Sequence, residues 1–265
     1  MADVEIFNKK LRILHRNRAS KNLAAHNFLL QEVADRLGER LAEEITKKFK
    51  RILIVGSWKT LPYKRMFQNL KTDYIVYTDI SQNMLDNKKI SVCMDEEFIP
   101  FKDKSFDLVI SLLDLHWVND IPGCLIQLRR VLEEDGLFLG AIFGGDTLKE
   151  LREALSLAEI DLRGGISPRV SSFTDIKDAG MLLSRAGFKS PVTDSEIITV
   201  THSSILSLMH DLRGMGETNA MLKMSKQPLT KEMLSTITSK MKNHTNPDGQ
   251  IRSSFEIISM TAWKN

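Results

Sequence analysis

The sequence predicts an α/β fold in which a parallel sheet is covered by helices on both faces. Short apolar runs rich in β-branched residues recur through the first half of the chain, and helix-like segments lie between them. The runs also lack the in-and-out alternation of a strand with one exposed face. Strands and helices that alternate in this way indicate parallel strands joined by crossover helices.

A helical N-terminal region precedes the first predicted strand. From Asn22 to Lys48 apolar residues recur at intervals of three and four, which is typical of an amphipathic helix. Before it, between Ile6 and Gln31, basic residues occur without any acidic residue. This basic patch either holds an anionic partner or forms a solvated helix face. Its members are Lys9, Lys10, Arg12, Arg16, Arg18 and Lys21.

The alternating region spans residues 51–145, which we expect to form the core of the fold. Its five apolar runs have the length of strands, and the segments between three pairs of them have helical character. The predicted strands are Arg51–Gly56, Asp73–Tyr77, Ile90–Cys93, Phe106–Ser111 and Gly136–Phe143, and the predicted helices are Lys59–Leu70, Ser81–Asn87 and Ile121–Leu132.

Residues 1–50 form the N-terminal helical region described above. After the core, residues 146–265 no longer show the regular alternation of strands and helices. We expect mostly helices here, with strands near Ile197–Thr201 and Phe255–Ala262. A helix from Asp175 to Arg185 would be closed by Gly187, where a C-terminal capping glycine belongs. The C-terminal part is therefore predicted to complete the sheet and to add an inserted helical cap.

Composition restricts the class of protein. The chain has 265 residues, of which 42% are hydrophobic and 27% charged, so it is neither disordered, fibrous nor membrane-embedded. No apolar stretch is long enough for a membrane span. The net charge of +3 excludes a protein that coats polyanions, and we expect no nucleic-acid partner. Cys93 and Cys124 form no metal motif and fit a reducing compartment.

One glycine turn and two carboxylates predict a nucleotide-binding site. In a doubly wound sheet a ligand binds at the carboxyl ends of the strands, where the first turn supplies backbone donors. Gly56 ends the first strand, and Asp79 ends the second, where a carboxylate accepts hydrogen bonds from ribose hydroxyls. Asp95 follows the third strand, within reach of an adenine amino group. Each residue has a structural alternative, a plain turn for Gly56 and a helix cap for either aspartate.

Together these features resemble the class I S-adenosylmethionine-dependent methyltransferases, in the variant with Asp-x-x-x-x-Pro-Phe after the third strand. The resemblance covers Arg51 to Gly145 and implies a Rossmann-like sheet with S-adenosylmethionine as cofactor. Trp58 and Thr60 replace the second and third glycines of the family's Gly-x-Gly-x-Gly loop. Because those glycines let the backbone approach the ligand, we expect weak cofactor binding. The implied cofactor-binding residues are Gly56, Ser57, Trp58, Asp79, Ile80, Asp95, Glu96 and Ser111.

Segments outside this core resemble one branch of the superfamily more specifically. That branch comprises alphaproteobacterial and mitochondrial assembly factors of respiratory complex I, which are described as protein-arginine hydroxylases. A neighbouring branch, the malonyl-acyl-carrier-protein methyltransferases of biotin synthesis, shares the core and the Leu115–Trp117 region less completely. The matching segments are Leu115–Asp120, Gly144–Arg152, Gly164–Arg169, Leu182–Phe188 and Asp211–Asn219.

The closer resemblance implies a complex I peripheral-arm subunit as partner and one of its arginines as substrate. Carboxylates could receive the guanidinium group by paired hydrogen bonds, and their alternative role is capping and salt bridging within the cap. His116 follows the fourth strand and is the candidate catalytic residue, with Trp117 as a pocket wall. A buried structural pair is the alternative. The candidate substrate-binding residues are Asp146, Glu150, Asp211 and Glu217.

Three functions stay open at this point. The chain is an enzyme that modifies an arginine in complex I assembly, a methyltransferase for a small molecule or malonyl-acyl-carrier protein, or a noncatalytic assembly factor. No histidine is followed two positions later by Asp or Glu, so we expect no non-haem iron site and no metal. The family match begins at Ile6 and no leader peptide is evident, which predicts a cytoplasmic, bacterial protein.

Overall fold

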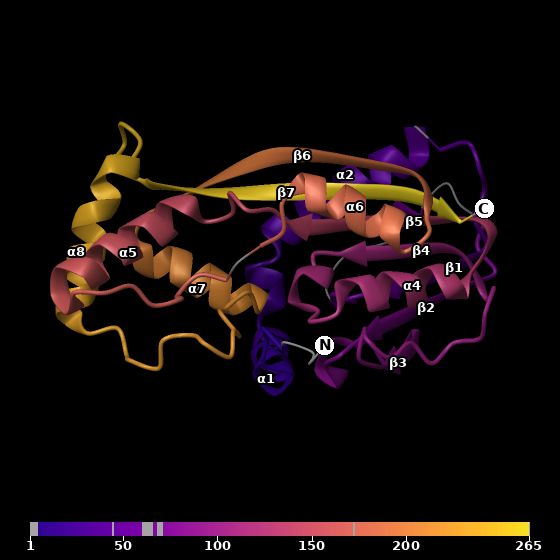
Figure 1. Cartoon of the computed structure of the whole chain (residues 1–265), viewed down its shortest axis with the longest axis horizontal. Helices are drawn as coiled ribbons and strands as arrows, with labels where there is room; N and C mark the ends of the chain where they lie inside the picture. Colours follow the sequence, from indigo (N-terminus) through magenta and orange to yellow (C-terminus); the bar gives the residue numbers. More distant parts are fainter. Residues whose placement is uncertain (1–4, 44, 60–65, 68–70, 172, 265) are drawn as a thin grey trace.

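A computed structural model describes residues 5–43, 45–59, 66–67, 71–171 and 173–264 of the chain (Figure 1). Seven strands among these residues form one sheet in the order β3-β2-β1-β4-β5-β7-β6. The first five strands are parallel, and β7 pairs antiparallel with both β5 and β6. The predicted α/β class, with a Rossmann-like methyltransferase sheet, is confirmed. The strands are β1 (Arg51–Val55), β2 (Tyr74–Asp79), β3 (Ile90–Cys93), β4 (Phe106–Leu112), β5 (Leu132–Phe143), β6 (Lys189–His202) and β7 (Ile251–Lys264).

Both faces of the sheet are buried, as successive residues of β1 show. Ile52 and Ile54 belong to one hydrophobic core, whereas Leu53 and Val55 belong to the other, and all four are fully buried. Because each face meets helices, an apolar residue is favoured at every position, and the alternation of a half-exposed strand is missing. Helix α2 (Phe28–Glu43) contributes to the first core, and α4 (Ile121–Val131) and α6 (Ile176–Arg185) contribute to the second.

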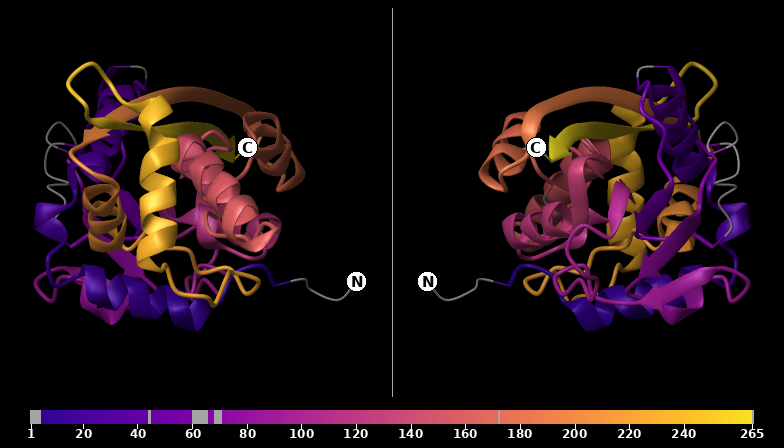
Figure 2. Two further views of the ribbon diagram at one scale, coloured as in Figure 1. Left: turned by 90° about the vertical axis from the view of Figure 1, so that its left-hand side faces the viewer. Right: turned by 90° about the vertical axis from the view of Figure 1, so that its right-hand side faces the viewer.

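A helical lobe lies beyond the carboxyl ends of the parallel strands. The chain enters it after β5, and the long strands β6 and β7 reach from the sheet toward it (Figure 1). Helices α5 and α8 pack against each other there, as the end-on view also shows (Figure 2). Helix α1 lies at the border of the sheet and the lobe, where it contacts α7. These helices are α1 (Lys9–Ala19), α5 (Lys149–Arg163), α7 (Ile205–Met215) and α8 (Lys231–Met241).

Two of the helices predicted for the core are not found as predicted among the described residues. The segment Ser81–Asn87 forms only the 3-10 turn η2 (Gln82–Met84), so the helix prediction is wrong there. The reason is local, because the Asp86 side chain accepts a hydrogen bond from the Lys88 backbone and favours a turn. The predicted helix Lys59–Leu70 falls mostly outside the described residues.

The predicted helix before Gly187 is confirmed. The Asp175 carboxylate caps α6 by accepting a hydrogen bond from the backbone of Lys177 at 2.8 Å. Beyond the helix end, Gly187 adopts φ +87°, the left-handed conformation that glycine reaches without strain.

Candidate functional site

The turn after β1 is built around Gly56. It has φ +73°, and a Cβ atom there would overlap the side chain of Asp114, so glycine is required on both grounds. Trp58, two residues on, is fully buried and donates its indole N–H to the Leu112 carbonyl at 2.8 Å. The bulky side chain is therefore accommodated within the core. Thr60 lies outside the described residues.

Three carboxylates meet at the carboxyl edge of the sheet. Asp79 ends β2, Glu96 follows β3 and Asp114 follows β4, and each is at most 1% exposed. Burial raises the pKa of Asp79, and it raises the pKa of Glu96 to about 8. Sequence reasoning missed Asp114. The signal was available, because Asp114 follows its strand as Asp79 and Asp95 follow theirs.

Two arginines of α1 occupy the space between these carboxylates. Arg16 donates to both carboxylate oxygens of Asp79, with its Nε 3.0 Å from Oδ1, and its guanidinium lies 4.1 Å from the Trp58 ring centroid. Arg12 donates to Glu96 at 3.0 Å and also to Asp114. Because they are four positions apart, both arginines lie on one face of the helix.

The basic patch divides into two parts, of which one, with Lys10 and Lys21, is exposed, as expected of a solvated helix face. Arg12 and Arg16 are 3% and 2% exposed, so this side of α1 is not a solvated face, and it is paired with carboxylates of this chain. Lys9 is also paired, since its ammonium contacts Asp95 at 2.8 Å. The physical reason is that acidic strand ends far along the chain provide the counter-charges.

These contacts decide how the predicted cofactor residues fit S-adenosylmethionine. Both oxygens of Asp79, the predicted ribose acceptor, are bonded to Arg16, and Asp95 is engaged with Lys9. Ser57 offers its carbonyl to Arg16 at 3.3 Å. Ile80 is buried, and Ser111 lies inside β4 with no hydrogen-bond partner for its Oγ among the described residues. With α1 in place, these residues do not fit the cofactor.

His116 and Trp117 converge on one carboxylate oxygen. Both belong to the turn η3 (Leu115–Trp117), directly after Asp114. Glu217 Oε2 accepts from Trp117 Nε1 at 2.9 Å and lies 3.1 Å from His116 Nε2. Because a carboxylate only accepts, His116 carries its proton on Nε2. Its Nδ1 is buried and has no hydrogen-bond partner among the described residues.

Glu217 lies on a cavity of about 410 Å³ in the helical lobe. Its walls are largely apolar and come from α5, from α7 and from the segments that follow α5 and α7. Ser171 also lines it, with a buried Oγ that has no partner among the described residues. The lining residues are Leu148, Leu151, Leu155, Pro168, Arg169, Val170, Ser171, Phe173, Met209, Leu212, Arg213, Glu217, Thr218, Asn219, Met224, Ser225 and Leu229.

The other three predicted substrate carboxylates lie elsewhere. Asp211 contacts His26 at 2.8 Å and His202 at 3.2 Å. Glu150 accepts hydrogen bonds from the backbone and hydroxyl of Ser254. Asp146 is exposed and pairs with Lys149. The structure thus brings Glu217 together with His116 and Trp117, and it separates the other acids from that cavity.

The described residues offer neither a metal-binding cluster nor a membrane-spanning helix. In the part of the chain that the structure describes, no group of three or more His, Cys, Asp or Glu side chains could hold a metal ion. No helix of that part is both long and apolar enough to cross a bilayer.

Comparisons with known proteins define the class. Residues 53–140 match the family model described as a methyltransferase domain. The YcgJ protein of Bacillus subtilis superposes with a TM-score of 0.58 at 13% identity, over 87% of this chain and 98% of its own. Phosphoethanolamine N-methyltransferase 2 of Haemonchus contortus, solved with S-adenosyl-L-methionine, gives 0.53 at 16% identity, over 92% and 57%. The protein therefore has the class I methyltransferase fold.

Sequence relatives identify the family. The human protein named arginine-hydroxylase NDUFAF5, mitochondrial, is 38% identical over 98% of this chain and 77% of its own length. The protein of that name from Danio rerio is 35% identical over 98% and 83%. The chain belongs to this arginine-hydroxylase NDUFAF5 family, which confirms the closer resemblance. A malonyl-[acyl-carrier protein] O-methyltransferase of Halorhodospira halophila is also similar, at 32% identity over 89% and 81%.

The same relatives correct one prediction. The sequence led us to expect a cytoplasmic, bacterial protein, but the names of these relatives place them in mitochondria. The prediction was wrong because it rested on the start of the family match, which carries no information about a compartment.

Proposed function

We propose that this protein hydroxylates an arginine of a complex I peripheral-arm subunit, and that Glu217 receives the guanidinium group. The observation that carries the proposal is the place of Glu217, the one carboxylate among the described residues that line this largely apolar cavity, in contact with His116. Arg169 and Arg213 also line the cavity, and Arg169 is paired with Glu159. The family membership supports arginine as the substrate side chain, since the relatives are named arginine hydroxylases.

The cavity suits the two parts of an arginine side chain. Apolar walls such as Leu151, Leu155 and Met209 favour the methylene stem, because burying apolar surface is favourable. The charged end needs a carboxylate, since an unpaired buried charge is costly. Hydrogen bonds from His116 and Trp117 to one oxygen of Glu217 hold the carboxylate in place. Its other oxygen has no hydrogen bond within the described residues and is available to a guanidinium N–H.

His116 is the residue we propose to handle a proton in this site. It is 3% exposed, and its Nε2 faces Glu217 while its Nδ1 has no hydrogen-bond partner among the described residues. An imidazole whose second nitrogen has no partner is suited to exchange a proton with a bound substrate. Trp117 is proposed to position Glu217, because its indole N–H donates to the same carboxylate oxygen.

S-adenosylmethionine is the small molecule we propose for the carboxyl edge of the sheet. The methyltransferase fold supports it, and so does the place of Asp79 at the end of β2. Asp79 is paired with Arg16 in this structure, so the cofactor and Arg16 would share one carboxylate.

The arginine site can be tested with small probes and the cavity's own methionines. Met209 and Met224 line the cavity, so their methyl resonances report on its occupation. N-acetylarginine amide should shift these resonances, and N-acetylcitrulline amide, which is similar in shape but uncharged, should not. The shifts should disappear in Glu217→Gln, which keeps an oxygen acceptor for His116 and Trp117 but removes the charge.

Asp146→Asn is the matched control, because Asp146 is an exposed carboxylate away from the cavity. It should respond to the arginine probe as the unaltered protein does. Equal shifts with both probes, or an unchanged response in Glu217→Gln, would show that Glu217 does not receive the guanidinium.

A further inference from the structure

We infer that helix α1 closes the nucleotide cleft from within the chain, so that S-adenosylmethionine has to displace Arg16 from Asp79 before it binds. The inference rests on the proposed function in one respect, the choice of this cofactor as the ligand of the cleft. It goes beyond that function by making α1 a removable occupant of the site.

Arg16 and the ribose of the cofactor would compete for Asp79. A ribose binds such a carboxylate through hydroxyl groups, which need open access to the carboxylate oxygens. Arg16 already donates to both oxygens, and the backbone N–H of Ser81 donates to Oδ1 at 2.8 Å. Asp79 is 1% exposed, so no further hydroxyl can approach it. A ribose and the Arg16 guanidinium therefore exclude each other.

A ligand that displaces α1 also has to replace positive charge in the cleft. Arg12 and Arg16 supply the positive charges that face Asp79, Glu96 and Asp114 in the closed cleft. Removing the arginines alone would leave buried carboxylates unpaired, which is strongly unfavourable. S-adenosylmethionine carries a sulfonium charge and ribose hydroxyls, so it replaces part of what the arginines provide. The released guanidinium groups are then hydrated by water.

The packed face of α1 is mostly polar. Its buried residues are Arg12, His15, Arg16 and Ala19, so polar side chains outnumber apolar ones on the packed face. Leu14, by contrast, is 61% exposed. The apolar contacts of α1 come from Ala19, in the main core, and from Leu11, which packs against the cluster of Phe7 and Trp117. Ion pairs and hydrogen bonds supply the rest, and a ligand that takes over those polar contacts can displace the helix.

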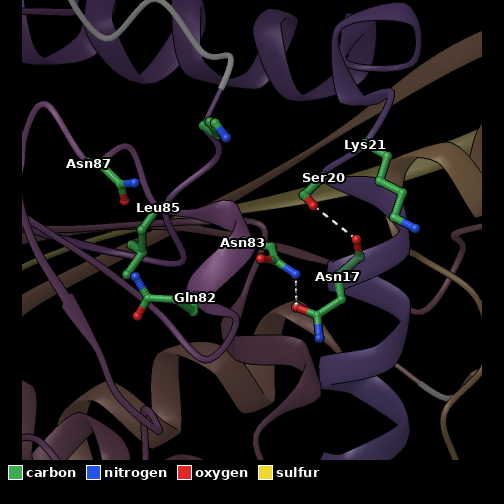
Figure 3. A pocket seen from close by; sticks show the side chains of 8 residues that line it. Asn17, Ser20, Lys21, Gln82, Asn83, Leu85 and Asn87 are labelled. Atoms are coloured by element: carbon green, nitrogen blue, oxygen red, sulfur yellow. Dashed lines mark hydrogen bonds between the residues drawn. The ribbon is translucent and has the colours of Figure 1, made fainter.

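The fold also leaves empty space beside the Arg16 site. A cavity of about 440 Å³ lies between the end of α1 and the turn η2, lined among others by Asn17, Lys21 and Asn83 (Figure 3). It adjoins the Asp79 site, because Asn17 accepts a hydrogen bond from Ser81, two residues after Asp79, at 2.6 Å. The amide groups here can bind the edge of a base. Because Asn17 lines the cavity from α1, withdrawal of the helix would open the cavity toward the ribose position and leave the amides of Gln82, Asn83 and Asn87 to contact a base.

The test measures binding of S-adenosylmethionine by calorimetry. Arg16→Gln keeps a hydrogen-bond donor near Asp79 but removes the charge and one arm of the paired contact. We expect it to bind S-adenosylmethionine roughly tenfold more tightly than the unaltered protein. Arg18→Gln is the matched control on the same helix, because Arg18 contacts Thr218 rather than the carboxylates, and its affinity should not change.

Hydrogen exchange of the unaltered protein gives a second reading that needs no variant. Amides of α1 should exchange faster when S-adenosylmethionine is added, whereas those of α2 should stay the same. Slower exchange of α1 with the ligand, or weaker binding by Arg16→Gln, would show that α1 holds the cofactor and would overturn the inference. Absence of binding in every variant would overturn it as well. The methyl shifts with N-acetylarginine amide test the arginine site separately.

Discussion

Five ionisable side chains are enclosed between α1 and the ends of three strands: Arg12, Arg16, Asp79, Glu96 and Asp114. Fully ionised, they carry one excess negative charge. Burial raises the pKa of Glu96 to about 8, so Glu96 holds a proton at neutral pH and the set is neutral. Burial opposes ionisation of Asp114, but the two guanidinium groups outweigh it and lower the pKa of that carboxyl.

The raised pKa of Glu96 predicts a pH dependence of stability. The unfolded chain releases this proton near pH 4.5 and the folded chain only near pH 8, so the folded state is favoured below this window and loses stability as the pH rises through it. Glu96→Gln carries no such proton. As the pH rises through this window, the free energy of unfolding of Glu96→Gln should therefore increase relative to that of the unaltered protein. The slope of this difference is at most about 1.4 kcal/mol per pH unit.

Urea unfolding of both proteins across this window measures the difference. Below about pH 4.5 the two curves should run parallel, because both side chains are then neutral in both states. Curves that stay parallel up to pH 8 would mean that Glu96 is ionised in the closed cleft.

At the scale of elements, Asp211 joins three parts of the fold. It lies on α7 and contacts His26, next to the turn η1 (Leu23–Ala25), and His202, the last residue of β6. Gly214, one turn further along α7, leaves room for the His26 ring, which an added Cβ would overlap. The sequence indicated a substrate carboxylate here, but these contacts support the alternative of salt bridging within the lobe.

Asp211→Asn should therefore destabilise the protein without affecting the arginine site. Loss of this carboxylate removes the charge-assisted hydrogen bond to His26, worth about 1.5–3 kcal/mol, and the ionic contact with His202. We expect the Tm to fall by several degrees, since about 1 kcal/mol corresponds to 2–4 °C in a chain of this size. The Asp146→Asn control should melt as the unaltered protein does. A response to N-acetylarginine amide that is lost in Asp211→Asn, with the Tm preserved, would restore Asp211 as a substrate residue.

At the scale of the whole molecule, the segment from Asp114 to Trp117 lies between two sites. Asp114 faces the arginines of α1, and His116 and Trp117 face Glu217 on the lobe cavity. Trp117 also donates its backbone N–H to the Asp114 carbonyl at 3.1 Å, and its ring meets Phe7 edge-on. One short turn thus connects the cleft, the cavity and the segment that leads into α1.

The sheet could be predicted from the sequence because burial on both faces marks the inner parallel strands β1 and β4 with nearly continuous apolar runs. The edge strand β3 is short and partly exposed, and its β-branched residues indicated it. The residues at the strand ends, Asp79 among them, could be predicted with the strands. The ion pairs of Arg12 and Arg16 could not, because their partners lie far along the chain and only the packing of α1 brings them together. The place of Glu217 beside His116 is likewise set by packing of the lobe.

The central claim, that this protein hydroxylates an arginine through the Glu217 site, is tested most directly by mass spectrometry of complex I peripheral-arm subunits. The subunits are compared between cells that lack this protein and cells supplied with the unaltered chain, Glu217→Gln or Asp146→Asn. We predict one arginine that carries an added oxygen atom with the unaltered chain and with Asp146→Asn, and that lacks it in the other two. An arginine that gains a methylene group instead, or subunits identical in all four, would contradict the account.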